Sequence, residues 1–97
     1  MSTAAEKRHM GKVAEVGCIL CHHLGLGATP AHVHHSREGQ GMSQRASNFL
    51  TMPLCPEHHQ GASGIHGLGA KAFERTYRLN ELDLLALTIE QLGARCR

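Results

Sequence analysis

The sequence predicts a small α+β domain, with helices at its two ends and two short strands between them. The 97 residues include nine histidines and four cysteines but only three aromatic side chains. Most of the histidines and cysteines lie in the middle of the chain, and patterns of helical periodicity flank them. Because a chain this short buries only a thin core, we expect bound metal to stabilise it.

Composition and charge exclude several classes of protein. The formal net charge is +2 and 19% of the residues are charged, so the chain is neither a polycation nor an acidic disordered tail. No apolar run reaches membrane-spanning length, and the first residues lack the pattern of a signal peptide. We therefore expect a single cytoplasmic domain over residues 1–97, with no membrane contact, whose cysteines bind metal rather than form disulfides.

The first zone, residues 1–16, is predicted to be an N-terminal helix. Thr3 and Glu6 have the spacing of a capping box, and apolar residues follow at helical spacing. The second zone, residues 17–70, holds eight of the nine histidines. Strands are expected at 30–35 and 49–54, and a third helix is expected to begin at Pro56.

The third zone, residues 71–97, is predicted to form two helices. Phe73 and Tyr77 lie one turn apart, Asn80 is a plausible N-cap of the second helix, and Gly93 is its expected end. Its buried face is expected to consist of Leu82, Leu85, Ile89 and Leu92. A competing interpretation is a structural helical protein that dimerises through this stripe.

Two half-sites have the spacing of a structural zinc site. Two residues separate Cys18 from Cys21, and two separate Cys55 from His58. This gap lets a tight turn direct both side chains at one tetrahedral ion, and three thiolates with one imidazole suit zinc. Two alternatives stay open, namely free cysteines buried in the core and a redox pair at Cys18 and Cys21. Cys96 is expected to be a free thiol.

A second group consists of His34, His35, His59 and His66. Adjacent residues of a strand point to opposite faces, so His34 can bind a metal while His35 faces a substrate. His59 follows the zinc ligand His58 directly, and His66 lies seven residues further on. Any one of these histidines alone would be interpreted as an ordinary surface or core residue, but the set favours a functional site.

The order of these features resembles the HNH, or ββα-metal, nuclease family. The more specific resemblance is to the phage recombination enhancement function (Ref) nucleases, and it rests on four segments: PAHVHH (30–35), PLCPEHHQG (53–61), IHG (65–67) and AFE (72–74). It implies a ββα-metal domain (the HNH, or His-Me finger, fold) with structural zinc and flanking helices, which cleaves DNA at sites directed by RecA filaments.

The resemblance also implies roles for individual residues. His35 takes the place of the general base, His34 and His59 become ligands of the catalytic metal, and His66 is a third ligand or a phosphate contact. The family's middle asparagine corresponds to Leu50 here, and the nearest asparagine is Asn48.

The function expected from these residues is metal-dependent hydrolysis of DNA with little sequence specificity. The catalytic ion is expected to be Zn²⁺, Mg²⁺, Mn²⁺ or Ni²⁺, and nitrogen ligands favour the transition metals over magnesium. Four basic residues are candidates for phosphate contacts, although each could be ordinary surface: Arg37, Arg45, Lys71 and Arg75. The alternative is a zinc-stabilised module that binds DNA without cutting it.

Overall fold

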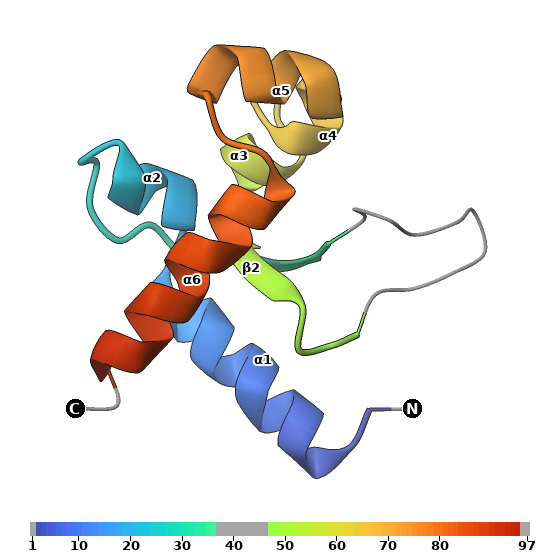
Figure 1. Ribbon diagram of the computed structural model, residues 1–97, viewed down its shortest axis with the longest axis vertical. Coiled ribbons are helices and arrows are strands. Elements are labelled where there is room, and N and C mark those ends of the chain that lie inside the picture. The colour runs from blue at the N-terminus through green and yellow to red at the C-terminus, as the bar shows by residue number, and fades with distance from the viewer. Residues whose placement is uncertain (1, 37–46, 96–97) are drawn as a thin grey trace.

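A two-stranded antiparallel hairpin lies at the centre of the fold (Figure 1). The computed structural model describes residues 2–36 and 47–95. The hairpin consists of β1 (His32–His35) and β2 (Thr51–Leu54), and His34 pairs with Met52 while His35 pairs with Thr51. Both strands are shorter than the predicted segments 30–35 and 49–54, because only the last four residues of each segment pair in the sheet.

Six helices surround the hairpin within the described residues. The two longest, α1 and α6, contact each other on one side, and the three helices that follow β2 lie at the opposite end of the molecule (Figure 1). None of the helices in the described part of the chain is long and apolar enough to cross a membrane. Their bounds are α1 (Ala4–Val16), α2 (Ile19–His23), α3 (Pro56–His59), α4 (Ile65–Leu68), α5 (Ala70–Tyr77) and α6 (Glu81–Arg95).

Helix α1 begins with the predicted capping box. The Thr3 hydroxyl accepts a hydrogen bond from the Glu6 N–H (3.1 Å), and Glu6 Oε1 accepts one from the Thr3 N–H (2.8 Å). The helix ends at Gly17, whose φ of +82° is strained for any residue with a side chain. After this turn the Cys18 N–H bonds the Thr29 carbonyl (2.8 Å), which fixes the position of the first cysteine.

Helix α6 differs from the predicted helix in its buried face. The predicted stripe is wrong at Leu82 and Ile89, which are 53% and 58% exposed. The face that packs inward instead carries Glu81, Leu84 and Thr88. Both polar groups on this face are satisfied, since Glu81 bonds a buried histidine and the Thr88 hydroxyl donates to the Leu84 carbonyl (2.8 Å). The other two residues of the predicted stripe, Leu85 and Leu92, are partly buried and pack against the core, so the prediction is right for them.

Of the two predicted ends of α6, the first is confirmed and the second is wrong. Asn80 caps the helix as predicted: its Oδ1 accepts from the Asp83 N–H, and its own N–H donates to Asp83 Oδ2, both at 2.9 Å. Gly93 does not end the helix, which continues to Arg95. An exposed glycine near a helix end costs about 1 kcal/mol, which is too little to stop the helix there.

The core joins the helices to the hairpin through the cysteine-rich turn. Leu84 of α6 and Phe73 of α5 are buried with Met52 and Leu54 of β2. Three cysteines belong to the same buried cluster: Cys18, Cys21 and Cys55. The small core is therefore built around a group of sulfur atoms, and whatever binds those atoms also stabilises the fold.

Glycines bring α3 and α4 close together. A Cβ at Gly64 would lie 2.5 Å from the Glu57 carbonyl oxygen, and one at Gly67 would overlap the Gly61 carbonyl. Because neither position has room for a side chain, α4 packs directly on the end of α3. The short helices, which are interrupted after His59, thereby place His66 beside His59.

Candidate metal centre and active site

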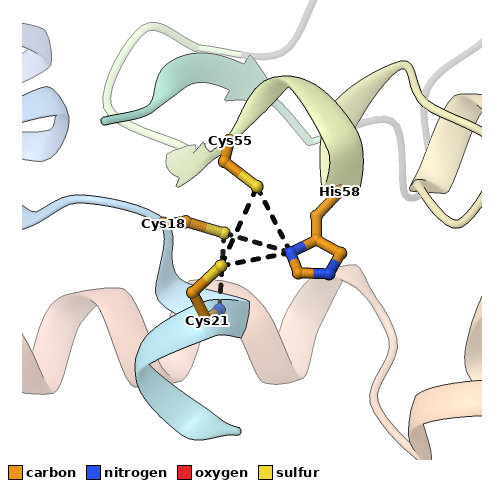
Figure 2. Close-up of side chains that lie close together, drawn as sticks. All are labelled: Cys18, Cys21, Cys55 and His58. Atoms are coloured by element: carbon orange, nitrogen blue, oxygen red, sulfur yellow. Dashed lines mark hydrogen bonds between the residues drawn. The ribbon is translucent and has the colours of Figure 1, made fainter. Parts of the chain in front are cut away.

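The first candidate centre is the group of three cysteines and one histidine at the junction of α2 and α3. Figure 2 shows Cys18, Cys21, Cys55 and His58 pointing toward one another. All four residues are buried, and one ligand atom from each lies within 4.8 Å of the others. The Cys21 N–H also donates to Cys18 Sγ (3.4 Å), which holds the first two cysteines in a tight turn.

The distances in this group fit a tetrahedral zinc ion. Nδ1 of His58 lies 3.6, 3.4 and 3.3 Å from the sulfur atoms of Cys18, Cys21 and Cys55. The sulfur atoms of Cys21 and Cys55 are 3.8 Å apart. Zinc bonds of about 2.3 Å to sulfur and about 2.0 Å to nitrogen place tetrahedral ligands roughly 3.5–3.8 Å apart. The predicted set of residues is thus brought together with the spacing that such an ion requires.

Electrostatics also favour a cation at this centre. Burial raises the pKa of the Cys18 thiol to about 12, so a thiolate there needs a positive charge beside it. Burial lowers the pKa of His58, which keeps its imidazole neutral and its lone pair available near pH 7. The arrangement can therefore hold a metal, and an ion bound there would lie in the core, among the sulfur atoms.

The second candidate centre consists of His34, His59 and His66. One ring nitrogen from each lies within 4.8 Å of the others, although the residues come from β1, α3 and α4. The ring centroids of His59 and His66 are 4.8 Å apart, and both rings lie 5.1 Å from that of His34. The structure thus brings together three residues that the sequence grouped, and their catalytic role stays a prediction.

A divalent ion fits the chemistry of this histidine cluster. His59 Nδ1 is buried and, within the described part of the chain, has no hydrogen-bond partner. Burial lowers the pKa of His59 to about 4, with smaller contributions from the neighbouring histidines. The ring is therefore neutral at pH 7 and carries a lone pair that an ion could use. His32, which was not among the predicted site residues, lies at the edge of the cluster, 5.7 Å from His59 between ring centroids.

Glu81 is a residue of the site that the sequence analysis missed. Its Oε2 lies 2.6 Å from Nε2 of His34, and both side chains are buried. A carboxylate accepts hydrogen bonds, so this contact leaves the lone pair of His34 on Nδ1, the nitrogen then available to a metal. A glutamate at the start of a long helix gives no sequence signal of this role, because Glu is common there.

His35 lies next to the cluster but on the other face of β1. Its Nε2 is 2.8 Å from Oδ1 of Asn48 in the loop before β2. Asn48 in turn donates from Nδ2 to Oε2 of Glu6 (2.9 Å) and to Oγ of Ser2 (3.1 Å). The asparagine nearest to the family position therefore holds His35 directly, although it lies two residues earlier than the resemblance implied.

Comparison with known families gives a direct match over almost the whole chain. A family model described as "Recombination enhancement, RecA-dependent nuclease" matches residues 2–93. The chain belongs to this family. No curated protein matches it.

Membership of this family indicates the kind of substrate to which the two candidate centres relate. The family's description names a nuclease that acts in recombination and depends on RecA, which implies a nucleic-acid substrate and a link to RecA. A nuclease must bind phosphates, so the basic residues predicted near the histidine cluster are candidates for phosphate contacts.

Two of the four predicted DNA contacts, Lys71 and Arg75, lie on α5 of this family member. Together with Glu74 and Arg78 they line an open groove of about 830 Å³. Lys71 and Glu74 also line a smaller hollow of about 170 Å³ that reaches Glu81. The groove therefore adjoins the hollow that is lined in part by Glu81, the residue that bonds His34. The other two predicted contacts, Arg37 and Arg45, lie outside the described residues.

Proposed function

We propose that this protein is a metal-dependent endodeoxyribonuclease of the HNH type, acting on DNA in the cytoplasm during recombination. The observation that carries the proposal is the convergence of His34, His59 and His66 beside His35. A hairpin followed by a helix supplies all of these residues except His66. This is the arrangement expected of a ββα-metal active site.

In the proposed mechanism, His35 acts as the general base. Its imidazole accepts a proton from the water that attacks the scissile phosphorus, a step for which imidazole is the side chain most often used. Asn48 holds the ring through Nε2, so the ring can present its other nitrogen to the water.

His34, His59 and His66 would hold the divalent ion, and Glu81 would orient His34. When bound there, such an ion would supply the positive charge that stabilises a phosphate oxygen and the leaving 3′-oxygen. Three protein ligands leave coordination positions open, which is typical of catalytic rather than structural sites. The Cys3His centre would carry a structural zinc ion with all of its positions filled.

DNA binding is proposed to depend on phosphate contacts from Lys71 and Arg75 in the groove along α5. The chain has three aromatic side chains, too few for extensive base stacking, so little sequence specificity is expected. A RecA filament on DNA is the proposed partner, as the family's description suggests.

Nicking of supercoiled plasmid tests this function. The full chain is treated with a chelator to empty the weaker site and then supplied with Mn²⁺, Ni²⁺, Zn²⁺ or Mg²⁺, with and without RecA filaments. His35→Ala should lower the nicking rate by about 10²–10⁴-fold, the usual contribution of a general base. His23→Ala, at an exposed position on α2, is the control and should nick normally. Equal nicking rates for His35→Ala and wild type would contradict the assignment of His35 as the general base.

Metal stoichiometry separates this function from the competing one. A zinc module that only binds DNA should hold one ion per chain at the Cys3His centre. The proposed nuclease should hold a second, more exchangeable ion, which His59→Ala should remove without loss of the first. A single ion per chain in wild type, together with absence of nicking at every metal concentration, would favour the binding module.

A further inference from the structure

A chain of hydrogen bonds connects the start of α1 to the proposed base. Glu6 uses both of its carboxylate oxygens: Oε1 accepts from the Thr3 N–H (2.8 Å) and Oε2 accepts from Asn48 Nδ2 (2.9 Å). Asn48 presents its Oδ1 to Nε2 of His35 (2.8 Å). One carboxylate therefore caps a helix and also holds the amide that contacts His35.

The direction of these bonds follows from what each group can donate. The hydrogen bonds from Thr3 and Asn48 lower the pKa of Glu6, so its side chain is ionised at neutral pH and only accepts. Asn48 must then turn its NH₂ group toward Glu6, which leaves its oxygen facing His35. The donor from Asn48 to Ser2 agrees with this orientation.

The orientation of the amide determines which nitrogen of His35 carries the proton. An amide oxygen accepts only, so Nε2 of His35 must be the donor in this contact. The lone pair of the neutral ring is then on Nδ1. A base with its proton on the wrong nitrogen has no lone pair to offer to the water, so catalysis requires this tautomer.

We propose that Glu6 is a positioning residue that fixes the tautomer of His35 through the side chain of Asn48. The proposal rests on the role of His35 as general base in the proposed function. It adds a part played by α1, which lies outside the hairpin and helix that hold the histidines. The capping box at Thr3 and Glu6 thus serves two purposes, since the bond that begins α1 also aims the second carboxylate oxygen at Asn48.

Glu6→Gln tests the relay with a side chain of nearly the same shape. The oxygen of Gln would keep the bond to the Thr3 N–H, and its NH₂ group would face Asn48. Asn48 must then turn its oxygen toward residue 6 and its NH₂ group toward His35. Nε2 of His35 becomes an acceptor, and the proton moves to Nδ1. The substitution therefore inverts the relay while it leaves the helix cap intact.

The tautomer is measured directly by long-range ¹H–¹⁵N NMR of the histidine rings in the zinc-loaded full chain, with His35 assigned from the spectrum of His35→Ala. Wild type should show the proton on Nε2, and Glu6→Gln should shift the population toward Nδ1. Plasmid nicking by Glu6→Gln should fall by about tenfold or more, as expected when a general base is largely in the wrong form.

Thr3→Ala is the matched control. It removes the hydroxyl cap of the Glu6 N–H but keeps the backbone bond to Glu6 Oε1 and the contact with Asn48. It should lower thermal stability while the tautomer and the nicking rate stay as in wild type. This separates loss of the helix cap from loss of the relay.

An unchanged tautomer in Glu6→Gln would overturn the relay. A changed tautomer with a wild-type nicking rate, when His35→Ala has lost activity, would overturn its role in catalysis. Failure of the proposed function has a different signature, since His35→Ala would then nick as fast as wild type. The NMR measurement reports on the relay in either case, because it does not depend on DNA cleavage.

Discussion

Oε2 of Glu81 lies 2.6 Å from Nε2 of His34, and the two residues are 47 positions apart in the sequence. Glu81 begins the last helix and His34 belongs to the first strand. Both are buried, so the contact is shielded from water and salt. The relationship ties the packing of α6 to the geometry of the histidine cluster, because a displacement of the helix moves the carboxylate that holds His34.

Replacement of Glu81 should weaken the second metal site. Glu81→Ala removes the group that orients His34, and loss of such a partner typically lowers metal affinity by about 10–100-fold. Glu81→Gln, which can still accept a hydrogen bond, should lower it less. Competition with a chromophoric chelator measures the affinity, and Glu90→Gln at an exposed position of the same helix is the control. Equal affinity for Glu81→Ala and wild type would contradict the prediction.

Removal of the structural metal should unfold the protein. The sulfur atoms of Cys21 and Cys55 lie in the core, so Cys21→Ser or strong chelation should abolish the cooperative thermal transition seen by circular dichroism. Cys96→Ser, which changes a thiol outside the described residues, should melt as wild type does. A folded, metal-free Cys21→Ser protein would show that the metal is dispensable.

The same centre should lose its metal in acid. Burial raises the pKa of the Cys18 thiol to about 12, so this thiol must give up a proton when a metal binds near neutral pH. Metal affinity should therefore fall as the pH falls, and metal binding should release protons. Calorimetric titration in two buffers of different ionisation enthalpy measures the number released. A heat independent of the buffer would be inconsistent with bound thiolates.

Gly67→Ala should disturb the histidine cluster but not the Cys3His centre. A Cβ at Gly67 would overlap the Gly61 carbonyl, so α4 must move away from α3 and carry His66 with it. Metal analysis should show loss of the second ion with the first retained. Gly93→Ala is the matched control, since a Cβ there meets nothing within 4 Å and the helix gains about 1 kcal/mol from alanine. Two retained ions in Gly67→Ala would mean that α4 tolerates the side chain.

The open groove along α5, lined by Lys71 and Arg75 among others, should contribute to DNA affinity through the positive charge of these two residues. Lys71→Ala and Arg75→Ala should each weaken binding uniformly across sequences and reduce the slope of log K against log salt by about one. Fluorescence anisotropy with labelled duplexes at several salt concentrations measures both quantities. Lys12→Ala, on α1 far from α5 (Figure 1), is the control. An unchanged slope in both α5 variants would place the DNA elsewhere.

Local patterns predicted the parts of the structure that depend on neighbouring residues. The capping box of Thr3 and Glu6, the N-cap at Asn80 and the helix that begins at Pro56 all form as expected, because short-range hydrogen bonds and backbone geometry determine them. The predicted face of α6 was wrong at Leu82 and Ile89, because the burial of Glu81 depends on His34, a partner that only the folded chain supplies.

The two candidate centres also differ in how much of each could be predicted from the sequence. Spacing within the sequence was enough to group Cys18 and Cys21 with Cys55 and His58, since a short turn or the first turn of a helix holds each half-site. The sequence also grouped His34, His59 and His66, but it did not show how they meet: β1 contacts α3 directly, and glycine contacts pack α4, which carries His66, on α3.

The sequence by itself determined the chemistry of this protein: which side chains can bind metal, where the capped helices α1 and α6 begin, and which family the chain resembles. Tertiary structure decided how those side chains are held. Glu81 reaches His34 from the last helix, and Glu6 reaches Asn48 from the first. Both contacts join segments more than forty residues apart, and no local pattern encodes them, because their geometry exists only after the helices have packed against the hairpin.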